Sequence, residues 1–150
     1  MRIAVLGAGG WGPTLARLLC LARHEVTLWG HDPLHLEEMA ATSLNARYLP
    51  GIPLPTTWRL ESDVDRAVAN AECALVAVPS KAFREVTEHL ESFRGIVVSL
   101  TKGIEHDTGL TMCGILRATA PKAKHAALSG PTLAPEVARD IPTACVAAGD

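Results

Sequence analysis

Short runs of apolar residues alternate along this chain with segments in which apolar side chains recur at helical spacing. Most of the runs are solidly apolar, a pattern typical of parallel strands that are covered on both faces. A weaker, shorter strand is expected near Thr57–Leu60. The other predicted strands are Arg2–Leu6, Glu25–Trp29, Cys73–Val78, Gly95–Leu100, His125–Leu128 and Thr143–Ala148.

Helices are predicted between these strands. The apolar stripe that favours the first helix consists of Trp11, Leu15, Leu18, Leu19 and Ala22. The stripe of a later helix consists of Phe83, Val86, Leu90 and Phe93. Ser80, just after Pro79, is the predicted N-cap of this later helix. Another helix is expected to begin at Pro33 with Asp32 as its cap, and a short one is expected over Asp63–Ala71.

This alternation of strands and helices predicts an α/β fold, namely a Rossmann-like, doubly wound, mainly parallel sheet with helices on both faces. At 150 residues the chain has the size of one domain. Ligands of such folds bind beyond the carboxyl ends of the strands. The longest segment without periodicity, Ala41–Thr57, carries Pro50, Pro53 and Pro55, and we predict a functional loop there.

A glycine motif directly follows the first predicted strand. Gly7, Gly9 and Gly12 stand at G-x-G-x-x-G spacing between a buried strand and a helix, the arrangement that binds the pyrophosphate of a dinucleotide. A tight strand–helix turn without a ligand is the alternative interpretation. Gly7 allows the sharp turn, Gly9 lets backbone approach a phosphate, and Gly12 lets the helix pack close to the sheet. Pro13 falls in the first helical turn, where it is tolerated but removes one donor near the pyrophosphate.

Composition and charge narrow the class of partner. The formal net charge of −2 provides no bulk positive field for nucleic acid or an acidic membrane. No apolar stretch approaches the roughly 20 residues that a membrane-spanning helix needs. The N-terminus runs straight into a strand and lacks the features of a signal peptide. We therefore expect a cytoplasmic protein that neither inserts into a membrane nor binds nucleic acid.

The cysteines give no signal for a disulfide framework or a metal site. The four of them, Cys20, Cys73, Cys113 and Cys145, form no C-x-x-C pair and have no histidines at zinc spacing. Cys73 and Cys145 fall in apolar, strand-like runs, where a reduced thiol behaves as a small hydrophobe. We expect structural cysteines, with a regulatory thiol as the alternative, and no metal.

Candidate polar groups follow three other predicted strands. Gly30 and His31 occupy the place where an acid usually holds the ribose 2′-hydroxyl, so the site should tolerate a 2′-phosphate with His31 as a candidate contact. Lys102 follows a central strand, where its ammonium could meet an anionic substrate. The turn Ser129–Thr132 offers amides and a hydroxyl at the same edge. The alternative for His31 is an exposed histidine in a turn, and the alternative for Lys102 is a surface lysine. For Ser129–Thr132 the alternative is an ordinary turn without a ligand.

These motifs together resemble the bacterial-type NAD(P)-dependent glycerol-3-phosphate dehydrogenases. The matching segments are Gly7–Gly12 with Trp11, Asn45–Ile52, Val78–Ser80, Ser99–Glu105, Ser129–Thr132 and Ala134–Ala138. The resemblance implies reversible hydride transfer between a nicotinamide cofactor, NAD or NADP, and dihydroxyacetone phosphate. The product is sn-glycerol 3-phosphate for glycerophospholipid synthesis.

The resemblance also implies roles for particular residues. The implied substrate contacts are Lys102, Gly130 and Thr132. The implied cofactor contacts, the glycine motif included, are Gly7, Gly9, Gly10, Trp11, Gly12, His31, Tyr48, Ala82, Lys102 and Ala134. Gly10, where the family often has serine, and Pro13, where it has a small residue, depart from the pattern and could weaken a phosphate contact.

The family is longer than this chain and has a helical second domain that supplies the catalytic lysine. We therefore expect residues 1–150 to be the cofactor-binding domain of a longer protein, with no catalytic residue of their own and a possible homodimer at full length. The alternatives are another two-domain reductase, of the ketopantoate or β-hydroxyacid type, and a module that binds NAD(P) as a sensor without catalysis.

Overall fold

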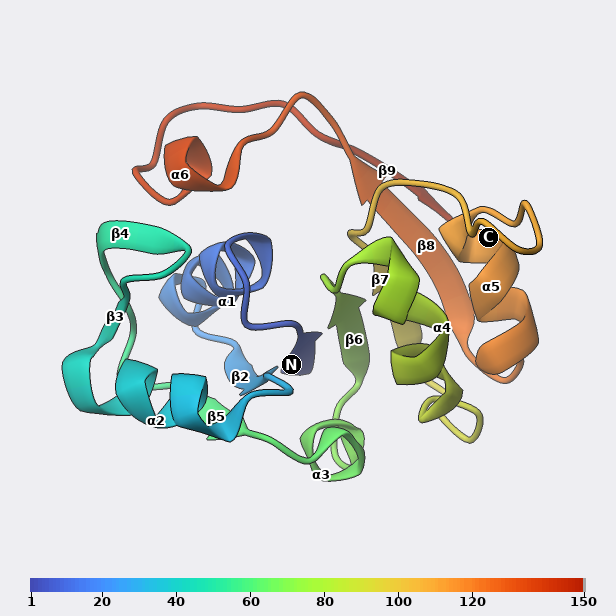
Figure 1. The fold of residues 1–150 in the computed structure, drawn as a ribbon, viewed down its shortest axis with the longest axis horizontal. Coiled ribbons are helices and arrows are strands. Elements are labelled where there is room, and N and C mark those ends of the chain that lie inside the picture. Colours follow the sequence, from blue (N-terminus) through green and yellow to red (C-terminus); the bar gives the residue numbers. More distant parts are fainter. Residues whose placement is uncertain (150) are drawn as a thin grey trace.

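A seven-stranded sheet organises the chain in the order β5-β2-β1-β6-β7-β8-β9 (Figure 1). The computed structural model describes residues 1–149. The strands are β1 (Arg2–Leu6), β2 (Glu25–Trp29), β5 (Arg59–Glu61), β6 (Cys73–Val76), β7 (Ile96–Ser99), β8 (Lys124–Ser129) and β9 (Val146–Gly149). All of them run parallel except β9. The predicted Rossmann-like, mainly parallel sheet is confirmed.

Helices cover both faces of this sheet. They are α1 (Trp11–Leu21), α2 (Pro33–Thr42), α3 (Val64–Val68), α4 (Ser80–Glu88), α5 (Met112–Thr119) and α6 (Ala134–Val137). Ile3 and Val5 of β1 belong to the core beneath α1 and α2, whereas Ala4 and Leu6 belong to the core beneath α3, α4 and α5. Because successive side chains of a strand point to opposite faces, a strand buried on both faces has to be apolar throughout.

The strand order places a crevice beside β1. From β1 the chain moves outward through β2 to β5, then crosses to β6 on the other side of β1. The loops after β1 and β6 therefore lead away from each other at the carboxyl ends of these two neighbouring strands. This is the switch point at which open α/β sheets bind their ligands.

The last strand corrects two predictions. The expected strand Thr143–Ala148 is β9, which begins at Val146, runs antiparallel to β8 and is exposed along its whole length. The connection after β8 carries α6 over to α1 and returns at the same end of the sheet, so the chain can only run back antiparallel (Figure 1). Cys145, expected in an apolar strand, is exposed just before this edge strand.

The helices also depart from their predicted patterns. In α1 the fully buried residues are Gly12, Pro13, Thr14 and Ala16, and of the predicted stripe Leu19 packs, partly buried, against the core. The close contact of the helix with the strand end at Gly12 favours small side chains at the most buried positions. Pro79, not Ser80, is the N-cap of α4, and Ser80 is the first residue of that helix. The predicted short helix is α3, capped by Asp63. The helices α5 and α6 were not predicted.

The proline-rich segment folds into a hairpin instead of a loop. Its strands β3 (Leu44–Asn45) and β4 (Leu49–Pro53) pair antiparallel beside the large sheet (Figure 1). Leu49 and Ile52 of the hairpin pack against Ala138, which follows α6. None of the helices within residues 1–149 has the length and apolar character needed to cross a membrane.

Candidate functional site

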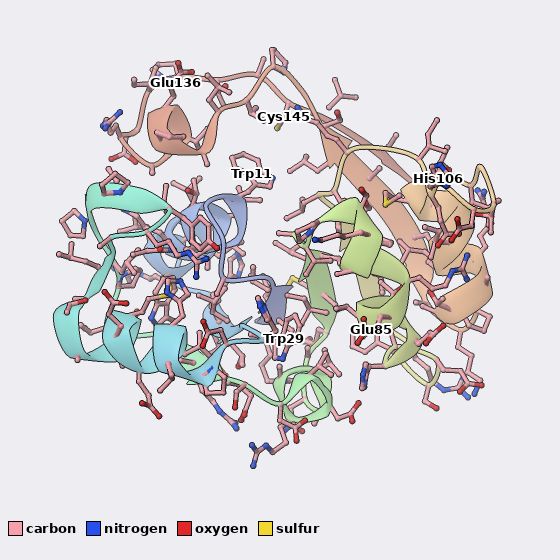
Figure 2. The ribbon with its side chains drawn as sticks, viewed as in Figure 1. Trp11, Trp29, Glu85, His106, Glu136 and Cys145 are labelled. Atoms are coloured by element: carbon pink, nitrogen blue, oxygen red, sulfur yellow. The ribbon has the colours of Figure 1, made fainter. Side chains whose placement is uncertain are left out.

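A cleft of about 830 Å³ opens at the switch point. Its walls are the glycine loop after β1, the end of β2, the loop after β6 with the first turns of α4, and the loop after β7. The predicted site residues in its lining are Gly7, Gly9, Gly10, Trp11, His31, Tyr48, Ala82 and Lys102. Figure 2 shows Trp11 in the space between α1 and the segment that carries α6.

The glycines of the motif have different surroundings. Gly7 has a φ of 128°, and a Cβ there would lie 2.5 Å from the carbonyl oxygen of Ala77. A Cβ at Gly12 would lie 1.9 Å from the carbonyl oxygen of Gly7, so the helix and the strand end touch at this point. A Cβ at Gly9 would meet nothing within 4 Å. Gly7 and Gly12 thus serve the fold, whereas Gly9 leaves space open for a ligand.

The glycine loop and the first turn of α1 together form a possible anion-binding cradle. The start of α1 provides its electrostatic part. Gly10 is the N-cap and has no side chain to satisfy the amides of the first turn. Those amides have no intrahelical partner, and the helix dipole adds a partial positive charge. Pro13 is buried within the unbroken helix, so it removes one donor without disturbing the cradle. The arrangement fits an anionic group of the size and charge of a pyrophosphate.

Two residues that were not predicted as site residues hold the glycine loop. Asn45 of the hairpin and His35 of α2 both contact backbone carbonyls of the loop. A single asparagine in a segment without periodicity, or a histidine on a helix, gives no signal of such a contact. Only the proximity of the hairpin and α2 to the loop after β1 brings these side chains there.

The end of β2 has no free acid at the ribose position. Asp32 accepts hydrogen bonds from the amides of Leu34 at 3.1 Å and His35 at 3.3 Å, which confirms it as the cap of α2. A Cβ at Gly30 would lie 2.8 Å from the Cβ of Ala8, so this position has to remain a glycine. His31 is exposed and lines the cleft, and its role as a cofactor contact stays a prediction.

Of the three predicted substrate residues, Lys102 lines the cleft, and Gly130 and Thr132 lie outside its lining. Nζ of the exposed Lys102 donates a hydrogen bond to the carbonyl oxygen of Gly130 at 3.1 Å. Thr132 lies two residues further on, outside the lining of the cleft. Ala134 also lies outside it, although its Cβ would be 3.7 Å from a Cβ at Gly10. The structure therefore joins Lys102 with Gly130, and Ala134 with the glycine loop.

An ion pair anchors the loop that carries Lys102. Nε and Nη2 of Arg84 on α4 donate to the two carboxylate oxygens of Glu105 at 2.8 and 2.7 Å. The hydroxyl of Thr108 also donates to this carboxylate. The Arg84 bond and then the Thr108 bond lower the pKa of Glu105 to about 2. The pair ties the segment after β7 to α4, whose first turn lines the cleft.

The remaining polar groups suggest no separate chemistry. Among residues 1–149 no three histidine, cysteine or acidic side chains gather as metal ligands would. All four cysteines are free thiols. Burial raises the pKa values of the Cys20 and Cys73 thiols, which keeps them protonated and unreactive.

A doubly wound sheet with a glycine-lined anion cradle at its switch point defines a Rossmann-type dinucleotide-binding domain. Residues 2–150 match the family described as the NAD-dependent glycerol-3-phosphate dehydrogenase N-terminus. The chain belongs to this family, which confirms the resemblance seen in its motifs.

Individual relatives agree with this assignment. The chain is 42% identical over 154 residues to a glycerol-3-phosphate dehydrogenase [NAD(P)+] of Syntrophobacter fumaroxidans, with 99% of the chain and 45% of that relative covered. It is similar to the crystal structure of glycerol-3-phosphate dehydrogenase from Coxiella burnetii, with a TM-score of 0.91, 34% identity, and 99% and 46% coverage. The chain thus spans less than half the length of these relatives.

The competing ketopantoate reductase interpretation receives less support. A ketopantoate reductase from Ralstonia eutropha has a TM-score of 0.67 to this structure at 26% identity, with 86% of the chain and 41% of that protein covered. The shared features are those of the general fold. The stronger match to the glycerol-3-phosphate dehydrogenase family extends over almost the whole chain.

Proposed function

We propose that this chain is the cofactor-binding part of an NAD(P)-dependent sn-glycerol-3-phosphate dehydrogenase, which reduces dihydroxyacetone phosphate to sn-glycerol 3-phosphate for glycerophospholipid synthesis. The observation that carries the proposal is the open space over Gly9 in a loop whose other two motif glycines are required by close packing. Membership of the family supplies the reaction.

Different residues of the cleft would contact different parts of the cofactor. The amides of Gly9, Gly10 and Trp11 would bind the pyrophosphate, and His31 would face the adenosine ribose. Tyr48 and Ala82 would flank the cofactor, and Ala134 would close against Gly10. The nicotinamide, when bound, supplies or accepts the hydride. Because no acid is free at the end of β2, both NAD and NADP are expected to bind.

The substrate end depends on Lys102. Its ammonium, held at the rim by the Gly130 carbonyl, would attract the phosphate or carbonyl oxygen of dihydroxyacetone phosphate. Gly130 and Thr132 would lie beside the substrate. The catalytic lysine is expected in a helical domain outside this chain, so residues 1–150 alone should bind the cofactor weakly and show negligible turnover. A homodimer and a cytoplasmic location also stay predictions.

Calorimetric titration of the folded chain with NADH and NADPH, side by side, tests the proposal. Saturable heat with either coenzyme is the expected result. Absence of heat with both at millimolar concentration would overturn it. Steady reduction of dihydroxyacetone phosphate by residues 1–150 alone would contradict the expected division between two domains.

A further inference from the structure

Two carbonyl groups of the glycine loop are held by side chains from the hairpin and α2. Nδ2 of Asn45 donates to the carbonyl oxygen of Gly9 at 2.9 Å and to that of Ala8 at 3.3 Å. Nε2 of His35 lies 3.2 Å from the same Ala8 oxygen. Asn45 is fully buried at 0% exposure and His35 is 9% exposed, so water does not compete freely for these bonds.

The direction of these side chains is determined by their other partners. The backbone N–H of Tyr48 donates to Oδ1 of Asn45 at 3.2 Å. Since only the oxygen of an amide can accept, the Asn45 amide cannot be reversed, and its NH₂ group faces the loop. The Ala8 carbonyl can only accept, so Nε2 of His35 carries the proton. The ring of His35 also meets that of Tyr48 edge-on at 5.6 Å.

Holding the carbonyls also sets the direction of the neighbouring amides. The peptide bonds of residues 1–149 are all trans. In a trans peptide plane the carbonyl of one residue and the N–H of the next point in opposite directions. With the Ala8 and Gly9 carbonyls held toward Asn45, the N–H groups of Gly9 and Gly10 point away from it. Gly9, Gly10 and His35 line the cleft, whereas Asn45, which holds both carbonyls, does not. On this geometry the two amides would point to the cleft side of the loop.

We propose that Asn45 is a positioning residue, assisted by His35, that orients the Gly9 and Gly10 amides as anion donors before the ligand arrives. The inference rests on the proposed function, because it concerns the phosphates of the same cofactor. A loop with glycines at these positions has unusual rotational freedom. Donors that already point at the anion avoid the free-energy cost of ordering on binding.

Binding of ADP and adenosine tests this role, since the two probes differ only in the diphosphate. Asn45→Leu keeps the number and branching of the side-chain heavy atoms and removes both donors without adding charge. We expect this variant to bind ADP about tenfold more weakly or worse, because two buried hydrogen bonds that orient the loop are lost. Its adenosine affinity, measured by NMR titration, should stay within about twofold of the parent, a shift small on the free-energy scale.

Asn70→Leu is the matched control. Asn70 is exposed, and its backbone carbonyl accepts a hydrogen bond from Arg2 at the end of the sheet away from the glycine loop. The control should bind ADP and adenosine with the affinities of the parent. If Asn45→Leu does not fold, His35→Leu decides. It leaves Asn45 in place, so a smaller loss of affinity, again confined to ADP, is expected.

The outcomes separate the two proposals. Equal loss of ADP and adenosine binding, or no loss of either, would assign Asn45 a merely structural role and overturn the inference while leaving the proposed function intact. Failure of the unaltered chain to bind ADP or NADH would overturn the proposed function, and the inference with it.

Discussion

The two ends of the cleft are held in different ways. At the glycine-loop end, Asn45 and His35 are buried and make several hydrogen bonds to one short stretch of backbone. At the other end, Lys102 is exposed and reaches Gly130 through one hydrogen bond. The backbone of the glycine loop is thus held by side chains of this chain. The Lys102 end has polar groups but little burial, which agrees with the proposed function, in which further parts of a longer protein would complete the substrate site.

The largest expected effect comes from the strand–helix contact at the glycine-loop end. Gly12→Ala places a methyl group 1.9 Å from the Gly7 carbonyl oxygen, so backbone has to move. We expect a loss of at least about 3 kcal/mol in the free energy of unfolding, measured by urea denaturation. If Gly12→Ala unfolds with the same free energy as the parent, the contact between Gly12 and the Gly7 carbonyl is not as close as the structure indicates.

Gly9→Ala separates binding from stability at the same end. Its methyl group meets nothing within 4 Å and occupies the space assigned to the pyrophosphate. NADH affinity should fall about tenfold, which corresponds to roughly 1.4 kcal/mol of binding free energy. The urea midpoint should remain that of the parent, and Gly12→Ala is the matched comparison. Unchanged NADH binding would remove Gly9 from the phosphate site.

The ion pair behind Lys102 predicts a pH dependence of stability. The folded-state pKa of Glu105 is about 2, below the ordinary value of 4.5. Its carboxylate therefore stabilises the fold above pH 4.5, and this contribution is lost as pH falls through the folded-state pKa. Glu105→Gln should lower the thermal midpoint at pH 7 and reduce the loss of stability on acidification.

Glu37→Gln, at an exposed position of α2, is the control for removing one acidic charge. This control should neither lower the thermal midpoint at pH 7 nor reduce the loss of stability on acidification. If the Glu105 variant unfolds with the same pH profile as the parent, the Arg84–Glu105 pair does not anchor the loop.

Only a small effect on stability is expected at the open end of the cleft. Lys102→Ala removes one exposed hydrogen bond to Gly130, so unfolding free energy should change by less than about 0.5 kcal/mol. In a protein as long as the relatives, the same change should lower the activity toward dihydroxyacetone phosphate. A large loss of stability in this chain, or full activity in the longer protein, would show that Lys102 is a structural residue.

The elements with strong local signals were predicted well. Arg2–Leu6 and Glu25–Trp29 have the expected bounds, because each is a short apolar run whose end is marked by the glycine motif or the capped helix that follows it. The Asp32 cap was predicted because its partners lie within three residues. The α1 stripe was only partly right: Leu19 packs against the core, but the closeness of the helix to the sheet at Gly12 places small residues at the most buried positions.

The sequence by itself determined the fold class, the position of the glycine loop and the family, because these depend on short motifs and on apolar runs that are read in order along the chain. Only the tertiary structure decided the direction of β9, the contact of Lys102 with Gly130 and the hold of Asn45 on the loop. Each of these joins residues or strands whose partners the local pattern does not specify. The path of the chain through space brings them together.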